Sequence, residues 1–129
     1  MTPNEIRLTD NEWEIYECLW ESAPLTLVQI SRRFAERTGL TRSTAETMVA
    51  RMEKKGLFRV VSGEKAKLFY PSIAREDAVK TETRSFLDKV YGGKPGLLIN
   101  AMAESENFSD EEIDRLYLIL KEARAKRSE

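Results

Sequence analysis

The stretch from Thr41 to Gly56 constrains the fold of this chain more than any other part of it. Thr41 can cap the first turn of a helix with its hydroxyl, and Gly56 can supply the left-handed residue that ends it. The opposite side of such a helix carries polar or small residues, so the stretch predicts one face for a core and one for a partner. The core face has the i, i+3, i+4, i+7 spacing of an amphipathic helix and comprises Ala45, Met48, Val49 and Met52.

A shorter helix is expected just before this stretch. Thr26 and Gln29 form a capping box at its start, and Thr38-Gly39-Leu40 ends it. Two short helices joined by a tight glycine-containing turn are typical of a helix-turn-helix, whose second helix enters a DNA major groove. The expected buried face of the first of them is Leu27, Ile30 and Phe34, whereas Arg32, Arg33 and Arg37 point away from it; the second helix bears a basic outer face.

The chain begins with another predicted helix, from about residue 10 to 21. Thr9 and Glu12 form its capping box. Trp13, Tyr16 and Trp20 then recur on one side, which indicates either core packing or a ligand-binding box; core packing is favoured, because large aromatic side chains dominate burial. Cys18, at the edge of this stripe, is interpreted as structural or incidental.

A β-hairpin is predicted after Gly56. Residues 57–61 and 67–70 are rich in strand formers, and Ser62-Gly63-Glu64-Lys65 is a turn. A helix-turn-helix followed directly by a hairpin is a winged helix. The hairpin residues Arg59, Lys65 and Lys67 are expected beside the phosphate backbone, although each of them could equally be an ordinary solvated strand residue.

Charge is distributed unevenly along the chain. Residues 26–70 hold ten Lys or Arg and four acids, a net +6, whereas the remainder carries −7. A basic segment in an acidic chain is typical of a polyanion-binding site, but chance clustering on a solvated surface gives the same count.

Three further helices are expected after residue 73. The first covers about 74–91, a Gly- and Pro-rich break follows at 92–96, and a short helix reaches about residue 103. Ser109 and Glu112 form the capping box of the last helix. These apolar stripes either meet a second chain or pack back onto the winged helix, and a symmetric dimer is the commoner solution. The predicted domains are therefore a winged helix at 1–73 and a helical dimerisation region at 74–129, a mainly α fold with one small hairpin.

Composition argues against several other classes of protein. The chain has one cysteine and no histidine, which excludes an internal disulfide and histidine-based acid–base catalysis. No nucleophile–base pair, metal-binding loop or cofactor motif is recognisable, so an enzyme is not expected. No signal peptide or membrane-length apolar run is present, and we expect a cytoplasmic protein that does not enter a membrane.

The chain resembles the BlaI/MecI/CopY family of bacterial repressors, also called penicillinase repressors. The resemblance covers nearly the whole length in order. It rests on LTDNEWEIYECLW at 8–20, TRSTAETMVARMEKKGL at 41–57, LFYPSIARED at 68–77, ETRSFLDKVYGG at 82–93 and SDEEIDRLYLIL at 109–120.

This resemblance implies a homodimeric repressor that occupies a palindromic operator in double-stranded DNA. Copper-responsive members carry a C-terminal Cys-x-Cys pair, which this chain lacks, so copper sensing is disfavoured. In the β-lactam-responsive members a regulatory protease cuts the C-terminal region. Asn100 matches the residue before that cut, but Ala101 replaces the aromatic residue after it. The alternative function is a winged helix that binds protein without sequence-specific DNA binding.

The residues expected to act follow from these interpretations. Arg can pair with guanine and Glu can accept a hydrogen bond from cytosine N4, so Glu46 either reads a cytosine or pairs with Arg42 or Arg51. The predicted DNA-binding residues are Arg42, Ser43, Thr44, Glu46, Thr47, Arg51, Lys54, Lys65 and Lys67. The predicted dimerisation residues are Phe86, Leu87, Val90, Ile113, Leu116, Tyr117 and Leu120.

Overall fold

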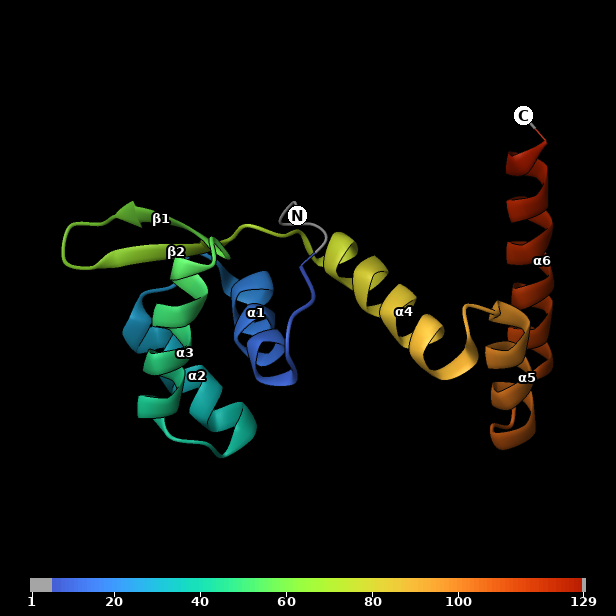
Figure 1. The fold of residues 1–129 in the computed structure, drawn as a ribbon, viewed down its shortest axis with the longest axis horizontal. Helices are drawn as coiled ribbons and strands as arrows, with labels where there is room; N and C mark the ends of the chain where they lie inside the picture. The colour runs from blue at the N-terminus through green and yellow to red at the C-terminus, as the bar shows by residue number, and fades with distance from the viewer. Residues whose placement is uncertain (1–5, 129) are drawn as a thin grey trace. The chain divides into compact units, whose positions relative to one another are not determined.

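The computed structural model describes residues 6–128, which form six helices and one two-stranded antiparallel sheet (Figure 1). The predicted mainly helical fold with a small hairpin is confirmed. The chain divides into two compact units, the first ending at Ser85 and the second beginning at Phe86. The elements are α1 Asp10–Ser22, α2 Leu27–Thr38, α3 Arg42–Lys54, β1 Phe58–Ser62, β2 Lys67–Pro71, α4 Arg75–Tyr91, α5 Pro95–Ser105 and α6 Asp110–Arg127.

Side-chain caps determine where four of these helices begin. The three predicted capping boxes are present: Thr9, Thr26 and Ser109 each accept a hydrogen bond from the backbone N–H three residues later, and the Glu or Gln there bonds back. Thr41 caps α3 by accepting the N–H of Thr44 at 3.1 Å. These caps satisfy backbone N–H groups that the first turn of a helix leaves without partners. A few neighbouring residues therefore determine where each helix begins.

The core of the first unit lies between α1, α2, α3 and the hairpin. Tyr16 is fully buried, and its hydroxyl donates a hydrogen bond to the Leu57 carbonyl. Trp20 packs edge-on against both Tyr16 and Trp13, with ring centroids 5.2 Å apart in each pair. The aromatic stripe of α1 is thus core packing, as predicted. The largest fully buried side chains beside it are Phe34, Ile15, Leu19, Ile30, Met52, Leu57 and Ile73.

The hairpin is fixed at both of its ends. Phe58 pairs with Pro71 at its base and Ser62 with Lys67 near its tip. At the tip, a Cβ on Gly63 would lie 2.5 Å from the carbonyl oxygen of Ala66, so this tight turn needs a glycine. At the base, Gly56 has φ +78°, the left-handed conformation predicted to end α3.

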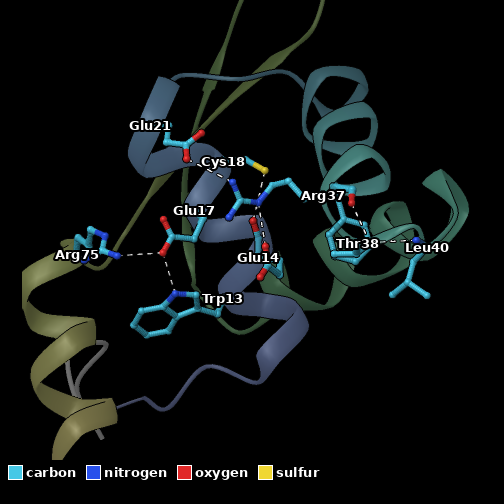
Figure 2. Close-up of polar contacts among 10 residues, drawn as sticks. Trp13, Glu14, Glu17, Cys18, Glu21, Arg37, Thr38, Leu40 and Arg75 are labelled. Atoms are coloured by element: carbon cyan, nitrogen blue, oxygen red, sulfur yellow. Dashed lines mark hydrogen bonds and ion pairs between the residues drawn. The ribbon is translucent and has the colours of Figure 1, made fainter. Parts of the chain in front are cut away.

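The first turns of α4 are tied to α1. Glu17 accepts hydrogen bonds from the Trp13 indole at 2.9 Å and from Arg75, the first residue of α4, at 3.1 Å (Figure 2). The Trp20 indole donates to the carbonyl of Ile73 at 3.0 Å. These contacts explain why the first compact unit continues beyond the hairpin to Ser85.

The second unit holds little buried surface of its own. Leu87 is buried in the last part of α4, and Phe86 packs edge-on against Tyr91. No described residue of α5 or α6 is buried. Helices of this kind usually gain most of their stability from packing an apolar face, so this unit presents apolar surface for further contact.

Candidate nucleic-acid interface

Helix α3 presents a continuous polar face to the surface of the first unit. Its buried residues are Ala45, Val49 and Met52. Successive residues of a helix are rotated by about 100°, so the face opposite these three residues points away from the core. Its side chains are short or flexible. The exposed residues of α3 are Arg42, Ser43, Glu46, Thr47, Ala50, Arg51 and Lys54, and Thr44 is half-buried.

Hydroxyl groups on this helix are partly engaged by the helix itself. The Thr47 hydroxyl donates to the carbonyl of Ser43 at 3.1 Å. The Thr44 hydroxyl lies 2.9 Å from that of its cap, Thr41. Thr44 therefore stays close to the helix start, whereas Thr47 remains exposed to a partner.

The two flanks of α3 face different elements. Arg51 lies beside the start of α1, where it lines a cavity of about 270 Å³ together with Asn11 and Lys55. Glu53, on the other flank, pairs with Lys67 of β2 at 3.4 Å. Any ligand lying along α3 would therefore meet the start of α1 on one side and the hairpin on the other.

The cations of the basic segment fall into two groups. Arg37 pairs with Glu14 at 2.9 Å and Glu21 at 3.3 Å on α1, and the Glu14 hydrogen bond raises the pKa of its guanidinium (Figure 2). Arg37 therefore joins α1 to α2. Lys55 pairs in a similar way with Glu12.

Other cations of this segment remain available to a ligand. Within residues 6–128, no ion pair or hydrogen bond engages the side chains of Arg42, Arg51, Lys54 or Lys65. Three of these cations lie on α3 and the fourth lies in the hairpin turn. Arg32, exposed on α2, also has no ion pair or hydrogen bond among residues 6–128, so the unpaired cations of the basic segment lie on α3, in the hairpin turn and on α2.

An open apolar cavity of about 400 Å³ lies between the start of α2, α3 and the hairpin. Leu27, predicted in the buried face of α2, lines this cavity and is 36% exposed, so that prediction is wrong. Leu27 is the first residue of α2, and the cavity rather than the core lies beside it. Val28, Ala50 and Ala66 complete its apolar rim.

The described part of the chain holds neither a cluster of metal-binding side chains nor a membrane-spanning helix. No group of three or more Cys, Asp or Glu side chains there could hold a metal ion. The Cys18 thiol is buried, which raises its pKa. No helix of residues 6–128 is long and apolar enough to cross a membrane.

A sequence profile of the family described as penicillinase repressor matches residues 8–122. The chain belongs to the penicillinase repressor family. Family members are DNA-binding transcriptional repressors, and the exposed face of α3 lies within the matched region together with the whole wing.

Individual members of the penicillinase repressor family match this chain along nearly its full length. The penicillinase repressor of Bacillus licheniformis is 24% identical over 123 residues, covering 95% of this chain and 96% of the relative. The penicillinase repressor of Staphylococcus aureus is 26% identical and covers 93% of this chain and 95% of the relative. A solution structure of the DNA-binding domain of the repressor BlaI is also similar, with 20% sequence identity and a TM-score of 0.49. The match covers 54% of this chain and 85% of that domain, and the family is shown without it.

The predicted dimerisation residues of this family member lie in its second unit. Phe86, Val90, Tyr117 and Leu120 are exposed, by 44, 51, 72 and 53%, whereas Leu87 is buried within the chain itself. A cavity of about 510 Å³ opens between α5 and α6 and is lined by Ile99, Phe108, Ile113, Leu116, Tyr117 and Leu120.

The predicted cleavage residues lie inside α5. Asn100 is exposed, and its side-chain amide donates to Glu104 at 3.4 Å; Ala101 is half-buried. The peptide bond between them is therefore part of a regular helix.

Sequence reasoning missed two features of this site. The ion pairs of Arg37 and Lys55 join residues that are 16 to 43 positions apart in the sequence. The sequence offered one signal for the Arg37 pairs: Glu14 and Glu21 lie on the same face of α1. The sequence indicated the apolar cavity more weakly, through the two adjacent apolar residues Leu27 and Val28 in the first turn of α2.

Proposed function

We propose that this chain represses transcription as a homodimer that inserts one copy of α3 into each of two successive major grooves of a palindromic operator. The observation that carries the proposal is the exposed face of α3, which keeps hydrogen-bonding groups and unpaired cations free for a ligand. Membership of a repressor family supports DNA as that ligand.

Within this proposal the residues of α3 divide into two groups. Ser43, Glu46, Thr47 and Arg51 face base edges, since side chains on the exposed helix face can reach the major-groove edges. Arg42, Thr44 and Lys54 contact phosphates. Such backbone contacts position the protein and supply most of its sequence-independent affinity.

The wing extends the phosphate contacts beyond α3. Lys65 lies in its turn and Lys67 begins β2. The Lys67 ammonium pairs with Glu53, but its side chain is 63% exposed, so it can exchange that partner for a phosphate. Exposed ion pairs of this kind contribute little free energy, which makes the exchange inexpensive.

The second unit supplies the dimer contact in this proposal. Exposed apolar side chains on α5 and α6 would lie in water in a single chain, and burying them against a second copy is favourable. A twofold-symmetric dimer then presents two α3 helices to two half-sites about one helical turn apart, or a multiple of that distance.

Relief of repression by a protease is the last part of the proposal, with Asn100–Ala101 as the bond that is cut. Its exposure supports access, but a protease binds an extended segment, so part of α5 has to open first. Local opening of α5, none of whose residues is buried in the single chain, costs little while its apolar side chains are not held in the dimer contact.

Selection of bound duplexes from a random pool tests this function directly. The expected result is an inverted repeat with regular half-site spacing. Binding that weakens steeply as salt rises is also expected, because phosphate contacts release counterions. Enrichment of no sequence, with salt-independent capture of a protein partner instead, would favour the alternative protein-interaction module.

A further inference from the structure

Glu46 is an exposed acid on the face of α3 that the proposed function assigns to DNA. Within residues 6–128 its carboxylate makes no hydrogen bond or ion pair. An unpaired carboxylate facing phosphates is repelled by them. The position therefore calls for a compensating contact with the bound DNA.

Neither neighbouring arginine supplies that contact from within the chain. Arg51 lies five residues after Glu46, about 140° further around the helix, and on the flank beside α1. Arg42 lies four residues before it, the less favourable order for a helical acid–base pair, and it forms no ion pair with Glu46. The structure thus leaves the Glu46 carboxylate for an external donor.

Three of the side chains around Glu46 are short. Ser43 lies three residues before it, and Thr47 and Ala50 follow; all three are exposed. A helix lined by such residues can approach the floor of a groove closely, and the longer Glu46 side chain then extends beyond its neighbours. With α3 in the major groove, as the proposed function has it, the carboxylate can then reach a base edge.

An ionised carboxylate only accepts hydrogen bonds, which restricts the base it can read. In the major groove cytosine presents the N4 amino donor, whereas guanine presents two acceptors and thymine an acceptor and a methyl group. Adenine presents a donor beside an acceptor, N7, which repels a carboxylate. Cytosine is the base whose own edge offers a donor without an adjacent acceptor.

We propose that Glu46 accepts a hydrogen bond from N4 of one cytosine in each half-site and so sets a C·G preference there. This inference rests on the proposed function, because it requires α3 to lie in the major groove. Guanine and thymine leave the carboxylate desolvated without a donor, and adenine sets its N7 acceptor beside the donor, so Glu46 discriminates mainly by penalising these bases.

The test compares three proteins in selection from a random duplex pool: the wild-type chain, Glu46→Gln and Glu36→Gln. Glu46→Gln keeps the size of the side chain, and Glu36→Gln removes the same charge from an exposed position of α2. The wild-type chain and Glu36→Gln should select the same C·G pair in each half-site. Glu46→Gln should lose that preference, with a shift toward A·T, and keep all others.

A second measurement probes the donor atom. Replacing the selected cytosine by N4-methylcytosine puts a methyl group where the groove-facing N–H was. The wild-type chain should bind this duplex about tenfold more weakly, the usual order of a single-pair mismatch, and Glu46→Gln should show little change.

Each other outcome is decisive. If Glu46→Gln selects the same bases as the wild-type chain, the ionised carboxylate does not set the preference; if it relaxes all positions equally, Glu46 does not read a cytosine; the repressor proposal stands in both cases. Equal sensitivity of both proteins to N4-methylcytosine has the same meaning. If the wild-type chain selects no sequence at all, both the proposed function and this inference are overturned.

Discussion

The carboxylate of Glu12 accepts a hydrogen bond from the Lys55 ammonium at 3.1 Å, which joins the first turn of α1 to the residue that caps the end of α3. The same carboxylate accepts the Thr9 N–H at 2.8 Å. Burial on its own raises the pKa of Glu12, but the hydrogen bonds from Thr9 and Lys55 outweigh burial and hold the pKa below its ordinary value of 4.5. The recognition helix is thus held at its C-terminal end by an ionised side chain.

This contact predicts a pH dependence of stability. A group whose pKa is lower in the folded than in the unfolded chain contributes stability above its unfolded pKa, and loses it as the pH falls through the folded value. Glu12→Gln should lower the free energy of unfolding by roughly 1 kcal/mol at pH 7, and the difference from the wild-type chain should shrink at pH values below 4.5.

Urea denaturation over a pH series measures this difference. Glu64→Gln, in the exposed hairpin turn, is the matched control and should change stability little at any pH. A Glu12→Gln difference that stays constant from neutral to acid pH would argue against the role of the ionised carboxylate.

Arg51 and Lys65 should affect DNA binding in different ways. Arg51→Ala removes a predicted base contact, so it should cost about 1–3 kcal/mol and relax specificity at one base pair. Lys65→Ala removes a predicted phosphate contact and should weaken all sequences alike, with a smaller salt dependence. Binding isotherms on the selected operator and on its single-base variants separate the two effects. Unchanged discrimination by Arg51→Ala would contradict its assignment.

Association of the chain should depend on the exposed apolar face of α6. Leu120 is 53% exposed, so Leu120→Glu disturbs no core of its own chain, but it would bury a charge in the proposed dimer interface. Sedimentation at micromolar concentration should show a dimer for the wild-type chain and a monomer for this variant. Val28→Glu, an equally exposed apolar position in the first unit, should remain dimeric. A monomeric wild-type chain would refute the dimer.

Gly63 should be essential for the shape of the wing. An alanine there places its Cβ against the Ala66 carbonyl oxygen, and the turn has to open to relieve the clash. Gly63→Ala should raise hydrogen exchange of the amides in β1 and β2 while those of α1 stay protected. DNA affinity should fall for all sequences alike. Exchange rates equal to those of the wild-type chain would show that the turn tolerates a side chain.

The sequence predicted those features of the fold that depend on neighbouring residues. The capping boxes at Thr9, Thr26 and Ser109 each need only four consecutive residues, and all three are present. The left-handed Gly56 and the hairpin followed from similarly local patterns. Local chemistry was sufficient at these positions because the helix or turn itself supplies the hydrogen-bonding partner.

Predictions that depended on distant parts of the chain were less reliable. Arg37 was expected only to point away from the buried face of α2, and its two partners, Glu14 and Glu21, were not predicted, because they depend on how α1 packs across α2. Leu27 was expected in the core, yet the space beside it is the open cavity against the wing. For Glu46 the sequence left two roles open, reading a base and pairing with an arginine. Only the positions of the side chains show that neither Arg42 nor Arg51 pairs with it.

The hydrogen bond from the Thr47 hydroxyl to the Ser43 carbonyl has a consequence for which operators α3 can distinguish. With its proton used inside the helix, Thr47 offers only lone pairs outward, as Glu46 does one residue earlier. Arg51, a turn later, offers only protons. In the proposed complex the groups of α3 that face the bases are therefore graded along its axis, with the acceptors Glu46 and Thr47 in its middle and the donor Arg51 toward its end. A half-site that complements it places amino-bearing bases opposite Glu46 and Thr47 and guanine toward Arg51, so each half-site has a fixed direction.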